Sequence, residues 1–166
     1  MGFVRSSNLG NKGEQLFIGL CIQADLEATK EDDKLKQKEH DVKFQIGKKT
    51  YTCEVKYDYM AVKTGNICIE HHNAKKDEPS GIMATKATIW CQIILDGENP
   101  TVWIANTAEL KKFIENNEPT KKIIAGGDKN ANLYLYKLES ILPVVFKRLD
   151  NLDKAGILKV LKEMVK

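Results

Sequence analysis

The residues best suited to chemistry in this chain are Asp41, Glu54 and Lys56, with His40 directly before the first of them. A hard cation such as Mg²⁺ keeps several waters and takes one or two carboxylates plus a phosphate oxygen, and Asp41 and Glu54 suit that role. Such a metal lowers the pKa of a coordinated water, and a nearby ammonium orients the water or balances charge on the phosphorus oxygens. Lys56 suits this second role. The grouping therefore predicts a metal-dependent phosphodiesterase site.

Two strands are expected to position these residues. Residues 41–46 and 50–57 carry β-branched and aromatic side chains and are joined at Gly47-Lys48-Lys49, which predicts a hairpin. Side chains alternate along a strand, so Glu54 and Lys56 are expected on one face and Val55 on the other. The carboxylates and the ammonium converge if Asp41 lies at the splayed end of its strand. The alternative is a surface hairpin with solvated charges, since Glu-x-Lys triplets are frequent by chance.

The order of the surrounding elements resembles the PD-(D/E)XK nuclease superfamily, whose core runs helix, three strands, helix, strand. The matching segments are residues 11–25 (helix), 41–46, 50–57 and 66–71 (strands), 80–87 (helical turn) and 88–95 (strand). His40 stands where the family motif has proline, and the Glu-x-Lys part is intact. The resemblance covers residues 10–95. It implies an α/β fold with a restriction-endonuclease-like core, in which helices flank a mixed central sheet of about four to six strands.

The resemblance also implies a cofactor, Mg²⁺ or Mn²⁺, and roles for particular residues. Asp41, Glu54 and the backbone carbonyl of Val55 are implied as metal ligands, and Lys56 lies beside the attacking water. Glu14 is implied in support, because many members carry an acidic residue on the first helix that reaches the metal site. By periodicity Glu14 lies one turn before Phe17 on the core-facing side, where a carboxylate needs a partner or a metal. The alternative is that Glu14 only favours the helix N-terminus.

A further set of residues is expected to border the site or bind substrate: Lys63, Glu70, His71, His72, Ser80, Thr85 and Lys86. In the resemblance, polar residues at the end of the 66–71 strand lie near the scissile phosphate, although a histidine pair at a strand end is more often a solvated edge. Ser80 is expected to cap the helical turn and leave backbone N–H groups for a phosphate. Lys86 is interpreted as a phosphate contact, and Thr85 equally as an ordinary strand-entry residue.

The distribution of charge suggests DNA as the partner, although the formal net charge is only +3. Arg5 and Arg148 are the only arginines, and base edges are most often read by Arg, Asn or Gln, so a lysine surface favours backbone and shape recognition. The alternative is an A·T-rich genome that favours lysine codons everywhere. The lysines on or beside the expected core are Lys34, Lys36, Lys38, Lys43, Lys48, Lys49, Lys63, Lys75, Lys76 and Lys86.

Length and composition, 166 residues and 42% hydrophobic, favour a single nuclease domain over 1–166. Residues 96–166 are expected to form a scaffold and substrate platform. It comprises a strand at 101–105, a helix capped by Thr107, a loop at 126–130 suited to touching DNA, a strand at 133–138, and a final helix capped by Asp153. The apolar face of that helix could equally form a homodimer contact.

No apolar run is long enough to span a membrane and no signal peptide is expected, so the expected location is the cytoplasm of a bacterial cell or an infected host. Cys21, Cys53, Cys68 and Cys91 form no Cys-x-x-Cys pair and are interpreted as reduced core thiols.

The sequence therefore predicts a metal-dependent deoxyribonuclease. A phage or mobile-element enzyme that acts on branched DNA is favoured, because no separate base-reading domain fits in the remaining length. A small type II restriction endonuclease is the nearest alternative. A catalytically idle relative that only binds nucleic acid or protein is another. Serine hydrolysis is not expected, because no Gly-x-Ser-x-Gly motif is present.

Overall fold

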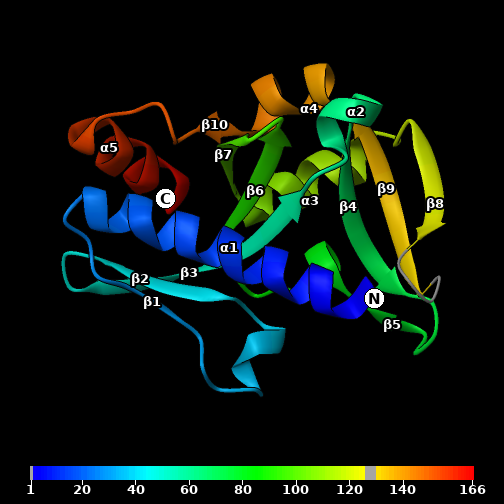
Figure 1. The fold of residues 1–166 in the computed structure, drawn as a ribbon, viewed down its shortest axis with the longest axis horizontal. Coiled ribbons are helices and arrows are strands. Elements are labelled where there is room, and N and C mark those ends of the chain that lie inside the picture. The colour runs from blue at the N-terminus through cyan, green and yellow to red at the C-terminus, as the bar shows by residue number, and fades with distance from the viewer. Residues whose placement is uncertain (1, 126–129) are drawn as a thin grey trace.

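A computed structural model describes residues 2–125 and 130–166 and has an α/β fold with a mixed six-stranded central sheet and a second sheet of four strands (Figure 1). Most of the loop expected to touch DNA, at 126–130, lies outside the described residues. The helices are α1 (Gly2–Gln23), α2 (Ala61–Thr64), α3 (Thr107–Asn116), α4 (Leu138–Val145) and α5 (Lys154–Met164), with 3₁₀ turns η1 (Lys36–Lys38) and η2 (Gly81–Met83).

The central sheet has the strand order β1-β2-β3-β6-β7-β10. Its strands are β1 (Ala28–Lys30), β2 (Val42–Ile46), β3 (Lys49–Asp58), β6 (Ile89–Asp96), β7 (Asn99–Asn106) and β10 (Lys147–Arg148). The predicted hairpin is confirmed: β2 and β3 pair antiparallel around Gly47, whose φ of 62° suits a glycine turn. On its other side β3 pairs with β6 in parallel, which makes the sheet mixed.

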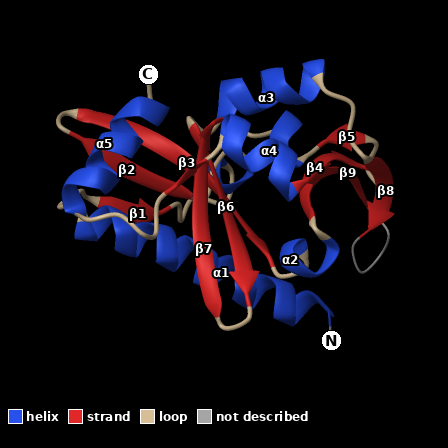
Figure 2. Cartoon of the chain, turned by 90° about the horizontal axis from the view of Figure 1, so that it is seen from above, coloured by secondary structure: helices blue, strands red, loops and turns tan. Residues whose placement is uncertain are grey.

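The second sheet has the order β5-β4-β9-β8 and stands to one side of the central sheet (Figure 2). Its strands are β5 (Glu78–Pro79), β4 (Asn66–Asn73), β9 (Ala131–Lys137) and β8 (Lys121–Ala125). The strand expected at 66–71 is present, but it pairs with β9 and β5 rather than with the Glu-x-Lys strand. The short α2 and the left-handed Gly65 turn the chain out of the central sheet after β3, and β6 takes the place beside it.

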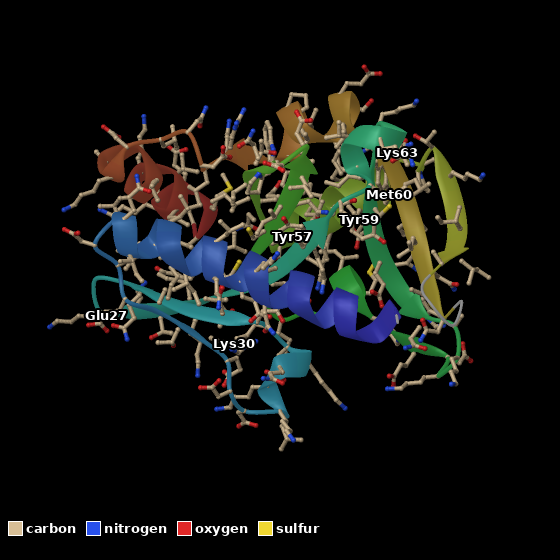
Figure 3. The ribbon with its side chains drawn as sticks, in the orientation of Figure 1. Glu27, Lys30, Tyr57, Tyr59, Met60 and Lys63 are labelled. Atoms are coloured by element: carbon tan, nitrogen blue, oxygen red, sulfur yellow. The ribbon has the colours of Figure 1, made fainter. Side chains whose placement is uncertain are left out.

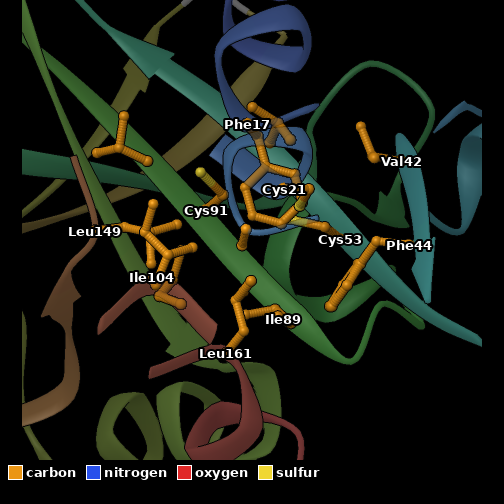
Figure 4. Packing of buried hydrophobic residues seen from close by; sticks show 14 of the residues in the cluster. Phe17, Cys21, Val42, Phe44, Cys53, Ile89, Cys91, Ile104, Leu149 and Leu161 are labelled. Carbon is orange, nitrogen blue, oxygen red and sulfur yellow. The ribbon is translucent and has the colours of Figure 1, made fainter. Parts of the chain in front are cut away.

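Two apolar cores lie on opposite faces of the central sheet. On one face α1 and α5 lie side by side, and Phe17, Cys21, Cys53, Cys91 and Leu161 are fully buried there (Figure 4). On the other face the sheet packs against α3, α4 and the second sheet, around buried side chains that include Trp90, Ile67, Leu110, Tyr136 and Ile141. Alternation along β3 sends Val55 into the first core and leaves Glu54 and Lys56 on the second face.

Helix boundaries and caps differ from expectation at several points. The first helix extends from Gly2 to Gln23 rather than over 11–25. The predicted cap at Thr107 is wrong, because the side chain of Asn106 accepts from the backbone of Ala108 and Glu109 and Thr107 is already helical. Asp153 does cap α5, accepting from Gly156 N at 2.8 Å.

The turn after β5 is shorter than predicted. The helical turn expected at 80–87 is a single 3₁₀ turn, Gly81–Met83. Ser80 occupies its N-cap position, but the predicted cap is wrong: its side chain makes no capping hydrogen bond, and its Oγ is buried without a hydrogen-bond partner. The cysteines are free as expected, three of them buried and Cys68 half-buried. Among the described residues no helix is long and apolar enough to cross a membrane.

The tight contact between η2 and β4 predicts a large difference between two glycine variants. Gly81 has φ +50°, and a Cβ there would lie 2.2 Å from the carbonyl oxygen of Glu70, whereas Gly47 has φ +62° and open space. We expect Gly47→Ala to lower the free energy of unfolding by about 1–2 kcal/mol, the cost of a left-handed alanine. Gly81→Ala should cost about 1–3 kcal/mol more, because β4 has to move. Equal losses in urea unfolding would contradict this contact.

Candidate active site

The site is built where β2 separates from β3. The two strands pair as far as Val42 opposite Cys53, and Asp41 N donates to Cys53 O at 2.9 Å. Beyond Cys53, no described strand pairs with β3 on this side. The backbone N–H of Val55 instead donates to Asp41 Oδ2 at 2.7 Å. The N–H and C=O of one strand residue point to the same side, so the Val55 carbonyl also faces this open edge.

Glu54 and Lys56 share a face, as the alternation predicted. Lys56 Nζ lies 2.5 Å from Glu54 Oε1 and 5.7 Å from the centre of the Trp90 ring. The other oxygen of Glu54 accepts from Thr85 Oγ1 at 3.2 Å. Both Glu54 oxygens are therefore engaged by the protein, and this carboxylate fixes the direction of the Lys56 ammonium.

Glu14 reaches the site because α1 approaches β3 closely. A Cβ on Gly13 would lie 3.2 Å from Val55 Cγ1, so glycine permits the approach. The Glu14 side chain is only 14% exposed, and its Oε2 lies 2.6 Å from Lys30 Nζ. Since this oxygen is buried and receives no well-aligned hydrogen bond, the Lys30 contact is an ion pair, and Lys30 directs its hydrogen bond to Asn11 Oδ1 at 2.5 Å. Glu14 Oε2 is therefore already paired with the Lys30 ammonium, and a metal ion at this oxygen would compete with Lys30.

These groups meet at one pocket of about 280 Å³. It is lined by Gly10, Glu14, Asp41, Val55, Lys56, Tyr57 and Tyr59. The structure therefore brings Glu14, Asp41, Val55 and Lys56 together, as the sequence predicted. Glu54 is not part of the lining and contacts the pocket through Lys56. Figure 3 shows Tyr57 and Tyr59 where the chain leaves β3 above the α1 helix.

The electrostatics of the site favour an added cation. Burial raises the pKa of Asp41, the charge of Glu14 raises it further, and Lys56 and the Val55 N–H offset only part of this. Burial and the charge of Asp41 likewise raise the pKa of Glu54 against the opposing effect of Lys56. Burial by itself would lower the pKa of Lys56, but Glu54 and Asp41 outweigh it and raise the pKa, which keeps the ammonium charged. Among the described groups, Lys56 and the Val55 N–H therefore offset only part of the effect of burial on Asp41, and Lys56 and Thr85 only part of that on Glu54.

The donor atoms of the pocket suit Mg²⁺ or Mn²⁺. Asp41, Glu14 and the Val55 carbonyl offer oxygen ligands only, and a magnesium ion commonly takes one or two carboxylates while keeping several waters. Within residues 2–125 and 130–166, no group of three or more His, Cys, Asp and Glu side chains is arranged so that it could hold a metal ion.

The predicted substrate residues fall into separate environments. Thr85 is 3% exposed, and its hydroxyl also reaches Glu39 O at 2.9 Å, so it supports Glu54 rather than facing solvent. Lys86 is exposed and pairs with Glu39, and Lys63 lies exposed on α2. Glu70, on β4, is near enough to Lys56 to help raise its pKa.

His71 and His72 do not line the pocket. His71 stacks on Tyr134 with ring centres 3.8 Å apart, and its pKa is lowered by burial and by the neighbouring His72 and Lys122. His72 Nε2 lies 3.1 Å from Asp77 Oδ1. The β4–β9 pairing shifts its register between Glu70 and His72, as at a β-bulge.

Sequence reasoning missed two supports of the site. The first support is Lys30, which pairs with Glu14. The sequence spacing of the two residues does not predict this pair, because only the packing of β1 against α1 brings them together. The second support is Glu31, whose Oε2 lies 2.9 Å from both His40 Nε2 and Lys43 Nζ and so ties down the segment before Asp41. Lys43 and the Asp33 N–H lower the pKa of Glu31 to about 2. A buried histidine beside a candidate ligand was the available signal.

Comparisons with known proteins add no identification: no family model, no curated protein and no solved structure matches the chain. The resemblance to the PD-(D/E)XK superfamily therefore stays a prediction.

The raised pKa of Asp41 predicts how stability depends on pH in EDTA. The folded protein holds the Asp41 proton more tightly than the unfolded chain does, so ionised Asp41 destabilises the fold above its raised pKa. That destabilisation fades as the pH falls towards the ordinary value of about 3.9. Asp41→Asn keeps an oxygen for the Val55 N–H and stays neutral. It should exceed the parent in stability at about pH 8 and approach it at about pH 4.

Urea unfolding at both pH values measures this difference. Asp96→Asn, at the exposed last residue of β6, serves as the matched control because it makes the same substitution away from the pocket. An Asp41→Asn variant that is less stable than the parent at the higher pH would contradict the account.

Proposed function

We propose that this protein is a nuclease that hydrolyses DNA phosphodiester bonds with Mg²⁺ or Mn²⁺. The observation that carries the proposal is the pocket in which Glu14, Asp41, the Val55 backbone and Lys56 meet. The buried Asp41 carboxylate, whose pKa is raised, suits a metal cation. The Lys56 ammonium beside it, held by Glu54, suits a phosphate oxygen.

Each residue has a distinct role in this proposal. Asp41, Glu14 and the Val55 carbonyl hold the metal, which when bound lowers the pKa of water and neutralises charge on the phosphate. The Lys56 ammonium faces the same pocket and stabilises negative charge that grows on the phosphorus oxygens. Glu54 orients Lys56, and Thr85 holds Glu54. The role of Glu54 as a direct metal ligand stays a prediction, because both its oxygens have protein partners.

The substrate that we favour is branched or otherwise structured DNA in a phage or mobile-element setting, with the reaction in the cytoplasm. Incubation of the purified chain with supercoiled plasmid, linear duplex, single strands and a four-way junction, with and without Mg²⁺, tests this. Junction-selective cleavage supports the proposal. Fixed-length fragments indicate a restriction endonuclease, and Mg²⁺-independent cleavage or binding without cleavage overturns the proposed reaction.

A homodimer through α5 is a separate prediction, which sedimentation of the purified protein would test.

The metal assignment predicts that Asp41→Asn removes cleavage. Losing the carboxylate charge weakens cation binding without opening a core cavity, so folding and binding of DNA in Ca²⁺ should be retained. Glu54→Gln should also remove cleavage, because Lys56 loses the negative charge that holds its ammonium in place. Glu139→Gln, at an exposed position on α4, is the control and should cleave normally. Full activity of Asp41→Asn at limiting Mg²⁺ would exclude this metal site.

The position of Lys56 predicts that its loss affects rate more than affinity. Lys56→Ala should lower single-turnover cleavage by at least about 10²-fold, the scale found when one transition-state donor is removed. Dissociation constants in Ca²⁺ should change by less than about fivefold, since charge aimed at the transition state adds little to substrate binding. Lys159→Ala, on the exposed face of α5, should change neither. A parallel fall in rate and affinity would assign Lys56 to substrate binding.

A further inference from the structure

A second pocket, of about 440 Å³, adjoins the candidate active site. It lies between the end of β3 and the second sheet, and its lining residues are Lys56, Tyr57, Asp58, Tyr59, Met60, Thr64, Cys68, Glu70, Ile123, Ala125, Leu133 and Leu135. Lys56, Tyr57 and Tyr59 line both pockets. If a nucleic-acid phosphate binds at Lys56, the nucleoside attached to that phosphate therefore lies next to the second pocket.

The walls of the second pocket are largely apolar. Ile123 comes from β8, and Leu133 and Leu135 come from β9. At the rim the side chain of Tyr59 is 60% exposed and that of Met60 is 36% exposed. Figure 3 shows both at the turn between β3 and α2. Neither residue belongs to the two buried cores, so packing of the fold does not explain an aromatic ring at this place.

The charged groups of this pocket are unsuited to a phosphate. Asp58 and Glu70 line it, and Asp58 is held in place by hydrogen bonds from Met60 N at 2.9 Å and Cys68 N at 3.3 Å. Carboxylates repel a phosphodiester backbone. They accept hydrogen bonds from the amino groups of nucleobases, as acidic side chains do with cytosine. The pocket therefore suits the planar, uncharged part of a nucleotide whose phosphate lies at Lys56.

We propose that this second pocket binds an unpaired nucleobase next to the scissile phosphate, with Tyr59 stacked on the base and Asp58 and Glu70 as hydrogen-bond acceptors. The inference rests on the proposed nuclease function and extends it to a class of substrate. A base within a duplex has to leave its stack to enter a protein pocket, which costs a few kcal/mol, whereas a base in a single strand, loop or branch point is already available. The preferred substrates therefore carry an unpaired nucleotide at the cleaved bond.

Binding in Ca²⁺ tests the pocket without relying on cleavage. The probes are a fluorescein-labelled single-stranded oligonucleotide and its duplex, followed by anisotropy. Stacking of one base on an aromatic side chain contributes about 1–3 kcal/mol, so Tyr59→Ala should weaken single-strand binding roughly 5- to 100-fold. Duplex binding should change less than about twofold if no base enters the pocket. Tyr59→Phe keeps the ring and should bind as the parent does.

Ile124→Ala is the matched control. Ile124 is 61% exposed, neighbours Ile123 on β8 and does not line the pocket, so its truncation removes exposed apolar surface without touching the proposed subsite. We expect it to leave both affinities unchanged.

An abasic oligonucleotide series locates the base. Removing the base next to the cleaved bond should weaken binding to the parent protein as Tyr59→Ala does, and should add little further loss in that variant, because both changes remove the same contact. Fully additive losses would overturn the proposal, as would equal weakening of single-strand and duplex binding by Tyr59→Ala. A protein that neither binds nor cleaves any of the nucleic acids would overturn the nuclease function itself. Normal cleavage without a Tyr59 effect would overturn the base pocket alone.

Discussion

The hydrogen bond from Val55 N to Asp41 Oδ2 is the constraint on which the site depends. β3 is paired with β6 as far as Asp58 but with β2 only as far as Cys53, so the backbone at Val55 loses its strand partner on one side. A buried N–H without a partner costs about 1–3 kcal/mol, and Asp41 removes that cost by turning its carboxylate to the open edge. The same edge presents the Val55 carbonyl, and the close approach of α1 at Gly13 brings Glu14 beside both.

Charge links this edge to the opposite face of β3. Glu54 and Lys56 lie on the face of β3 opposite Val55, and Thr85 on the segment before β6 holds Glu54. Among the described side chains, Lys56 and Lys30 lower the pKa of Asp41 and Lys56 lowers that of Glu54, yet both pKa values remain raised because of burial. Functional sites often carry this kind of uncompensated charge, whereas a purely structural cluster would gain stability from pairing it.

The alternation that set Glu54 and Lys56 apart from Val55 was enough to predict the hairpin and the common face of the two charged residues. It could not show that the strand at 66–73 pairs in a second sheet, because periodicity reports burial and not the partner strand. Lys30 escaped prediction, and Thr85 was predicted without its Glu54 contact, because the pairs Lys30–Glu14 and Thr85–Glu54 span long sequence separations. The cap of α3 was predicted one residue too late, because both Asn and Thr are common caps. The backbone of Asn106 is still extended whereas Thr107 is already helical, so Asn106 is the cap.

The most direct test of a metal site at the β2–β3 edge is anomalous diffraction from crystals soaked in Mn²⁺, without nucleic acid. We predict a density peak in the pocket bounded by Glu14, Asp41 and Val55, at about 2.0–2.2 Å from an Asp41 oxygen, as expected for small hard divalent cations. Crystals of Asp41→Asn should show no such peak under the same soak. Strong Mn²⁺ peaks elsewhere on the parent protein with none in this pocket would contradict the account.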